Sequence, residues 1–439
     1  MLLGLLVVVL FLCFFIKDYR KGIILAAMTI QFLAYLGTGI PGVKISTLLM
    51  LISIAIYLFK KTIKQINPRI VSFQGEADYP KSLIIVSLLF ITSFLISDYN
   101  AENRQTAIVI TNILTMFFFP YVFWKSISSM EYLRYAIKCL IVLFTISFII
   151  AIPELLFRHN YYIDVIGNLF LLEDFVIDAH TVRFGIKRLN SIFSYLSVLG
   201  TISCFAFFLF FNLKYRYTYL YDKYKVSINC LCLILPFMAF ATGSRAIFLG
   251  LFAIFLSCVC DRCFFKHKSF KKLLLIFIVV SPIVLYIVAM VIDSIINSDT
   301  SKYAQGSTSD LRMLQWAICL PYFLESPLWG NGRMFIWDVV AKENPMLLGA
   351  ESIWFSILVD YGIFGGIAFL SLLLVTGRLL FKVKKAFVFF PVSYFLITLV
   401  SPDSGIQYNV YLTFVILLLK SNYFAKEDKV TLIKKSKYS

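Results

Sequence analysis

Long apolar stretches, separated by shorter polar segments, run along the whole chain. A helix needs about 20 apolar residues to cross the hydrocarbon of a membrane, and fewer when flanking side chains reach back to the interface. By this measure the pattern predicts thirteen membrane-spanning helices, and twelve is an alternative because the first, ninth and last stretches are short. The predicted spans lie near Met1–Ile16, Gly22–Leu36, Ile45–Phe59, Ser82–Ser97, Thr106–Trp124, Ala136–Leu156, Ile192–Leu213, Val226–Thr242, Ala246–Val259, Leu273–Ile292, Ser352–Thr376, Ala386–Val400 and Tyr408–Leu419.

Composition supports a membrane location for most of the chain. Of the 439 residues, 60% are hydrophobic and only 15% are charged, whereas a soluble domain carries about 25% charged residues. The mean hydropathy is +0.86. A soluble protein of this size could not bury so much apolar surface, so composition excludes a soluble enzyme, a secreted disulfide scaffold and a disordered chain. The expected fold is an all-α polytopic integral membrane protein.

The charges give this fold an orientation. When the loops are assigned alternately, one side of the membrane carries 30 of the 41 Lys and Arg residues and 8 of the 24 Asp and Glu residues, a net charge of +22. The other side carries a net charge of −5. An excess of Lys and Arg marks the cytoplasmic side. We therefore expect a cytoplasmic C-terminus and an acidic outer face, and the total charge of +17 does not indicate a nucleic-acid partner.

Two long segments are expected on the outer face, and they divide the chain. The second lies between the tenth and eleventh predicted spans and contains a predicted helix from Ser309 to Glu325, whose apolar residues suit the membrane interface. The turn from Ser326 to Gly332 ends this helix. The predicted divisions are an N-terminal bundle at 1–156, an outer loop at 157–191, spans at 192–292 with a Ser-Arg turn at 242–246, a large outer loop at 293–350, C-terminal spans at 351–420 and a basic cytoplasmic tail at 421–439.

Several arginines lie on the outer face, against the charge trend. The planar guanidinium stays charged and can hold phosphate oxygens at two points. Close to the membrane surface such side chains would bind the diphosphate of a lipid-linked sugar. The alternative is that they reach toward lipid headgroups or pair with acids of the loops. The candidates are Arg183, Arg188, Arg245, Arg312 and Arg333, with Ser244 beside Arg245 as a further contact.

Glu351 is the candidate base, because it lies at the outer end of the eleventh predicted span. A partly desolvated carboxylate there is suited to accept a proton from a sugar hydroxyl. The alternative is a helix N-terminal acid that complements the helix dipole. Cys258, Cys260 and Cys263 cluster at a cytoplasmic helix end, but the preferred interpretation is that they are small apolar residues. We expect no metal and no cofactor.

Four short outer segments resemble motifs of the O-antigen ligase and Wzy-type polysaccharide polymerase superfamily. The resemblance covers about Arg183 to Gly366, and the order of the motifs makes the set more specific than any one of them. The segment Thr242-Gly243-Ser244-Arg245-Ala246 is similar to the family's Ser-Arg-Gly/Ala turn, and Arg188 to Phe193 is similar to Arg-x-x-Gly-x-Phe, with Ser191 in place of the glycine. Arg312, Trp316 and the turn from Ser326 to Gly332 are together similar to the family's Arg/Trp…Pro-Leu-x-Gly-x-Gly stretch. In the fourth segment, Glu351-Ser352 is followed by nine residues and then by Gly362-Ile-Phe-Gly365, which is the spacing of the family motif His-[Asn/Ser], nine residues, Gly-x-x-Gly.

The resemblance implies a fold and a chemistry. The fold would be a GT-C-like helical glycosyltransferase in the bacterial inner membrane, with its active face in the periplasm. The substrate would be an undecaprenyl-diphosphate-linked oligosaccharide, and the partners would be membrane lipid and a chain-length regulator. In this scheme Arg188, Arg245 and Arg312 hold the donor diphosphate, Arg183 and Arg333 assist, and Glu351 acts on the acceptor hydroxyl.

The identity of the residue at position 351 favours a polymerase over a ligase. Ligases of the superfamily have a histidine at this place in the motif. The three histidines of this chain are His159, His180 and His267, and none of them occupies it. Two alternatives remain open. One is a ligase that transfers glycan to the lipid A core, and the other is a multi-span transporter, which would place charges near the middle of the bilayer.

Overall fold

The computed structural model describes residues 2–30, 32–33, 36, 44–66, 78–101, 104–169, 182–183, 186–193, 196–263, 309–344, 352–399 and 406–438. Nearly all of these residues are helical. The helices are α1 (Leu2–Lys17), α2 (Tyr19–Thr29), α3 (Ile45–Ile66), α4 (Lys81–Asn100), α5 (Thr106–Ile113), α6 (Phe119–Ser126), α7 (Met130–Phe157), α8 (Tyr161–Leu169), α9 (Leu196–Arg216), α10 (Thr218–Tyr221), α11 (Lys225–Ala241), α12 (Arg245–Cys263), α14 (Ser309–Glu325), α15 (Ala341–Glu343), α16 (Ile353–Val383), α17 (Phe389–Thr398) and α18 (Ile406–Tyr438).

Short irregular elements complete the described chain. π-Helical turns at Leu114–Phe118 and Ile336–Val340 lead into α6 and α15. 3-10 turns at Asp222–Tyr224 and Lys385–Val388 lead into α11 and α17. The strands β1 (Val182–Arg183) and β2 (Ile186–Lys187) are two residues each and pair antiparallel, with Val182 opposite Lys187.

The all-α polytopic fold expected from the sequence is confirmed. Within the described residues, seven helical segments are long and apolar enough to cross a membrane, and they correspond to the third to eighth and the eleventh predicted spans. Three shorter apolar helices, at Leu6–Lys17, Arg245–Cys260 and Lys385–Thr398, correspond to the first, ninth and twelfth. The predicted tenth span, Leu273–Ile292, lies outside the described residues.

The second predicted span was too long. It was expected over Gly22–Leu36, but α2 ends at Thr29. The chain then turns, and Ile45 donates its backbone N–H to the carbonyl oxygen of Leu36 at 2.9 Å, so α3 begins where the chain has folded back. The glycines and the proline between residues 37 and 42 disfavour a continuing helix.

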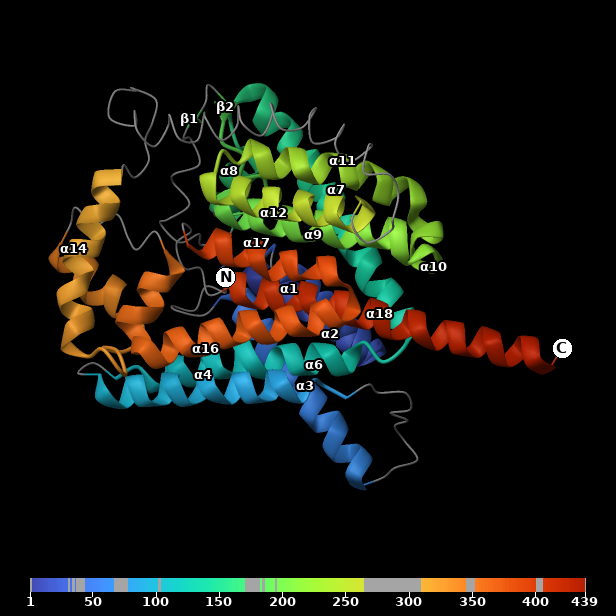
Figure 1. The fold of residues 1–439 in the computed structure, drawn as a ribbon, viewed down its shortest axis with the longest axis horizontal. Helices are drawn as coiled ribbons and strands as arrows, with labels where there is room; N and C mark the ends of the chain where they lie inside the picture. The colour runs from blue at the N-terminus through green and yellow to red at the C-terminus, as the bar shows by residue number, and fades with distance from the viewer. Residues whose placement is uncertain are drawn as a thin grey trace.

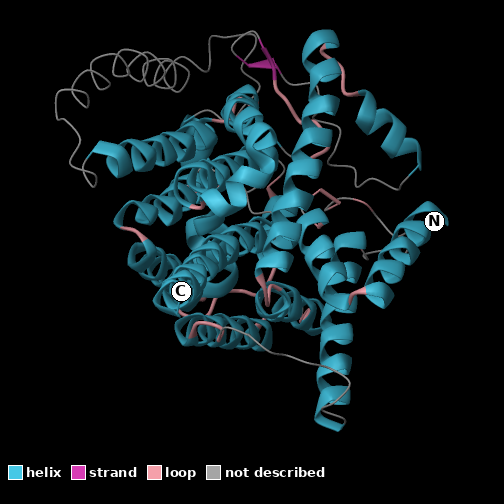
Figure 2. Ribbon diagram, turned by 90° about the vertical axis from the view of Figure 1, so that its right-hand side faces the viewer, coloured by secondary structure: helices cyan, strands magenta, loops and turns pink. Residues whose placement is uncertain are grey.

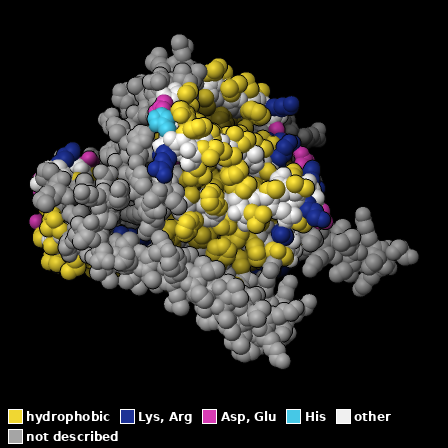
Figure 3. All heavy atoms as spheres, turned by 90° about the horizontal axis from the view of Figure 1, so that it is seen from above, with side chains coloured by type: hydrophobic (Ala, Val, Ile, Leu, Met, Phe, Trp, Pro, Cys, Tyr) yellow, Lys and Arg dark blue, Asp and Glu magenta, His cyan; other side chains and the backbone are white. Residues whose placement is uncertain are grey.

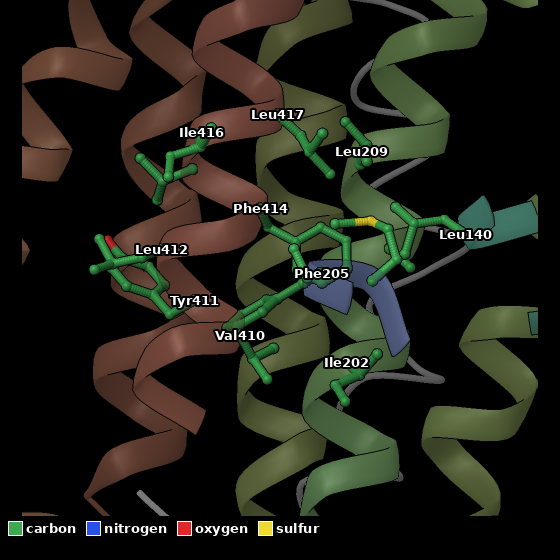
Figure 4. Close-up of a cluster of buried hydrophobic side chains, with 14 of the residues drawn as sticks. Leu140, Ile202, Phe205, Leu209, Val410, Tyr411, Leu412, Phe414, Ile416 and Leu417 are labelled. Atoms are coloured by element: carbon green, nitrogen blue, oxygen red, sulfur yellow. The ribbon is translucent and has the colours of Figure 1, made fainter. Parts of the chain in front are cut away.

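The long helices run roughly side by side and surround α9 (Figure 1). In α9, 83% of the span is buried inside the protein. Aromatic side chains fill the space around it, and the ring of Phe205 contacts those of Phe390, Tyr394, Tyr411 and Phe414 (Figure 4). Figure 2 looks along the bundle, with the C-terminal end of α18 toward the viewer. The core is therefore built around one central helix.

The outer surface of the bundle is apolar, as lipid contact requires. Figure 3 shows hydrophobic side chains over one broad face, and Lys and Arg side chains gathered at the end near α10. Large apolar residues on the peripheral helices are exposed, for example Leu88 and Ile85 on α4 and Leu233 on α11. In water an apolar surface of this extent would be costly, whereas hydrocarbon solvates it without cost.

Candidate functional site

Two hydrogen bonds hold the Arg188 segment (residues 186–193) against the outer turn (residues 242–244) between α11 and α12. Leu189 donates its backbone N–H to the carbonyl oxygen of the last residue of α11, at 3.0 Å. The Nε of Arg188 donates to the carbonyl oxygen of Thr242, also at 3.0 Å. The structure therefore brings Arg188, from the first long outer loop, onto the turn that leads into Arg245.

Arg245 is the first residue of α12 and is only 7% exposed. The outer turn before it is fixed by Gly243, which takes the left-handed conformation with φ 61°, and by the hydroxyl of Thr242, which donates to a carbonyl oxygen of α11 at 2.7 Å. Ser244 is half-buried beside it. The N-terminus of a helix attracts anions through its unpaired N–H groups and its dipole. The turn therefore combines a helix N-terminus with two arginines, a combination suited to a phosphate group.

A buried carboxylate outside the four motifs anchors the Arg188 segment. Glu154, near the end of α7, is 1% exposed. It accepts hydrogen bonds from the backbone N–H groups of Asn190 (3.1 Å) and Ser191 (2.6 Å) and from the amide of Asn160 (3.1 Å). Its Oε1 lies 3.6 Å from the ammonium of Lys187, which is equally buried. Burial lowers the pKa of Lys187, and the charge of Glu154 opposes that shift.

Ser191 explains why a glycine stands at the equivalent place in the family motif. Its φ is 51°, in the left-handed region that favours glycine. The conformation is held by the hydrogen bonds to Glu154 and by the Ser191 hydroxyl, which donates to the carbonyl oxygen of Ser147 at 2.6 Å. Hydrogen bonds from the serine thus offset the steric cost that a glycine would avoid.

A second anchored segment is the glycine turn (residues 326–334), which follows α14. The buried carboxylate of Asp360, on α16, accepts the backbone N–H groups of Met334 (3.0 Å) and Ile336 (3.2 Å). Its backbone carbonyl accepts the N–H of Gly332 at 3.1 Å. Asp360 therefore anchors the glycine turn to α16.

Two glycines let the glycine turn and α16 approach so closely. Gly362 has φ 65° and ψ −165°, so α16 is kinked there. A Cβ on Gly362 would lie 2.4 Å from the carbonyl of Leu328, and a Cβ on Gly330 would lie 2.3 Å from the carbonyl oxygen of Asp360. Such distances exclude any side chain. Gly362 therefore interrupts the helical path of α16 and admits the glycine turn.

Arg333, at the end of the glycine turn, is bound by a residue of the N-terminal bundle. With the Asn112 amide oxygen turned toward it, Asn112 accepts from Arg333 Nε at 2.6 Å and Nη2 at 3.1 Å. The Nη1 atom is buried and has no hydrogen-bond partner within the described part of the chain. Asn112 lies on α5, outside the region in which the sequence showed any motif.

Three candidate residues fall wholly or partly outside the described residues. Glu351 is among the residues not described. Arg183 lies on β1 and Arg312 on α14, and in both cases only the backbone is described. Among the described residues, no group of three or more His, Cys, Asp and Glu side chains is placed to hold a metal ion.

The three candidate arginines whose side chains are described form two separate groups. Arg188 and Arg245 lie with β2 and the start of α12, and Arg333 lies against α4 and α5. Figure 1 shows α12 and α4 on opposite sides of the bundle, with α16 and α17 between them.

Of the two site residues that the motifs did not indicate, only Glu154 has a signal in the sequence. A carboxylate inside an apolar span marks a functional position, whereas nothing in the sequence distinguishes Asn112.

The fold and these anchored outer turns define a multi-pass helical membrane protein with arginine-bearing turns at one end. Residues 230–370 match the family model described as O-antigen ligase, and this match supports a relation of that region to the O-antigen ligase and Wzy superfamily. The matched region includes the outer turn, Arg245, the glycine turn and the kink of α16. No curated protein matches the chain significantly. The match supports an O-antigen ligase or polymerase type of function.

Proposed function

We propose that the protein is a polysaccharide repeat-unit polymerase. It transfers a glycan from undecaprenyl diphosphate to the sugar of an incoming lipid-linked repeat unit, at the periplasmic face of the bacterial inner membrane. The observation that carries the proposal is the hydrogen-bonded contact between the Arg188 segment and the outer turn, which gathers Arg188, Ser244 and Arg245 at one helix N-terminus.

In the proposed reaction a sugar hydroxyl of the acceptor attacks the anomeric carbon of the donor glycan. The new C–O bond forms while the bond from that carbon to the diphosphate oxygen breaks, and the hydroxyl proton passes to the carboxylate of Glu351. The diphosphate leaves on its lipid with one additional negative charge. Arg188 and Arg245 stabilise that charge, because fixed cations in a site of restricted water are more effective than in bulk solvent. Arg312 and Arg183 are assigned to the same group.

Complementation of a deletion strain tests the assignment. Arg245→Ala and Glu351→Gln should each lower polymer production by about 100-fold, the loss typical when a charge-stabilising group or a base is removed. The matched control is Arg158→Asn, which removes an exposed outer arginine outside the site and suits its left-handed backbone. Wild-type chain length from both site variants, at equal protein levels, would rule out the proposal.

The ligase alternative predicts a different mutant phenotype. The family description favours it as the second candidate, because the matched model is that of O-antigen ligase. Loss of a polymerase leaves single repeat units on lipid, whereas loss of a ligase leaves long lipid-linked polymer that is not attached to its final acceptor. Gel electrophoresis of glycolipids from the deletion strain separates the two.

A further inference from the structure

An apolar groove opens on the outside of the bundle between α4 and α16. Its volume is about 190 Å³, and its walls include Leu89 and Ile96 of α4 and Phe364 and Ile367 of α16. Phe364, Ile367 and Leu89 are each between 40% and 51% exposed, so the groove faces the lipid side of the bundle.

The glycine turn closes one end of this groove. Trp329 lines the groove, and its ring stacks on that of Phe364 with centroids 4.3 Å apart and planes within 3°. Tryptophan rings prefer the boundary between hydrocarbon and water. The stack therefore marks the end of the groove at which a chain in the hydrocarbon would meet a polar headgroup.

The glycine turn that closes this end also carries a cation. Ile96 of the groove is followed by Ser97, whose hydroxyl accepts the backbone N–H of Gly332 at 3.1 Å. The next residue is Arg333, which Asn112 holds by Nε and Nη2 while Nη1 has no partner among the described residues. An apolar groove bordered by a turn that carries an oriented guanidinium complements a molecule with a long hydrocarbon chain and an anionic headgroup.

We propose that this groove and Arg333 bind the polyprenyl diphosphate of the acceptor, with Asn112 as the positioning residue that orients the guanidinium. The inference rests on the proposed function, because a polymerase handles two lipid diphosphates at once. The Arg188 and Arg245 group serves one of them. The groove lies on the other side of α16 and α17, so it is available to the second. The N-terminal bundle, through α4 and α5, thereby contributes to substrate binding.

Binding of undecaprenyl diphosphate to purified protein in detergent tests the tail site without needing polymer synthesis. Thr92→Trp places a large ring in the groove from an exposed position on α4. Leu95→Trp is the matched control, because Leu95 is 45% exposed on the same helix and does not line the groove. Native mass spectrometry should show two lipids bound to wild type and to Leu95→Trp, and one to Thr92→Trp.

Headgroup variants test the role of Asn112. Arg333→Gln and Asn112→Ala should weaken binding of the second lipid by about tenfold, as loss of one hydrogen bond to a charged group does. Asn112→Asp keeps an acceptor on the guanidinium but adds a negative charge, so it should weaken binding while leaving thermal stability unchanged. Thr111→Ala, whose hydroxyl bonds only within its own helix at 2.8 Å, should bind as wild type.

Three outcomes would overturn the inference: one bound lipid in the wild type, equal effects of the two tryptophan variants, or displacement of undecaprenyl diphosphate by an equal concentration of phosphatidylglycerol, which would make the groove a site for ordinary membrane lipid. Failure of the proposed function is distinguishable, because Arg245→Ala would then retain polymer whatever the groove variants bind. The inference is supported if Thr92→Trp loses the second lipid while Leu95→Trp keeps it.

Discussion

At the residue scale, the buried ion pair of Glu154 and Lys187 leads to a prediction about stability. Breaking a buried ion pair leaves one charge without compensation and costs about 3–5 kcal/mol. Glu154→Gln should therefore destabilise the protein by about 3 kcal/mol in detergent, measured by thermal or denaturant unfolding, and should lower polymer production because the Arg188 segment loses its anchor. The double variant Glu154→Gln with Lys187→Met removes both charges and should recover much of the stability.

The buried lysine gives the same variant a pH dependence. Because burial holds the pKa of Lys187 below its ordinary value of 10.5, the unfolded state binds more protons between the two values, and stability rises with pH in that window. Removing the charge of Glu154 lowers the folded-state pKa of Lys187 further and widens the window. The stability of Glu154→Gln should therefore rise with pH over a wider range below the ordinary lysine pKa of 10.5 than that of wild type. Parallel curves would show that the two groups are not coupled.

At the element scale, the kink of α16 is the feature most sensitive to substitution. Gly362→Ala adds a Cβ 2.4 Å from the carbonyl of Leu328, in a left-handed conformation, and should cost about 2 kcal/mol or more and displace the glycine turn. Gly377→Ala on the same helix is the control, since its Cβ would lie at an ordinary 3.5 Å from Pro391. Comparable thermal stability of the two variants would show that the turn does not need this contact.

The sequence predicted elements better than their connections. The apolar stretches gave most described helices to within a few residues, and α14 has the predicted bounds because a serine begins it and Ser326-Pro327 ends it. The kink at Gly362 was not predicted, since a glycine in an apolar run suits close packing equally well. Contacts between distant segments, such as Asn112 with Arg333 and Glu154 with Ser191, have no local signature. The site could therefore be predicted only as a set of candidates.

At the scale of the whole molecule, the distribution of charge predicts the orientation. In a cysteine-free background, Arg158→Cys should react with a membrane-impermeant maleimide in cells whose outer membrane has been permeabilised and whose inner membrane is intact. Lys223→Cys should react only after the inner membrane is permeabilised as well. Both positions are exposed, so access to the thiol depends on the side of the membrane. The reverse pattern, or equal labelling, would contradict the charge assignment.

The anchor at Glu154 also constrains the order of biosynthesis. The backbone groups of Asn190 that it binds lie 36 residues further along the chain. At about 5–20 residues per second of translation, roughly 2–7 s pass between synthesis of the carboxylate and synthesis of these backbone partners. During that interval the acid near the end of α7 can be solvated only by water, by the insertion machinery or by the nearby amide of Asn160. The network that later fixes the Arg188 segment therefore makes the early assembly of this helix dependent on its surroundings.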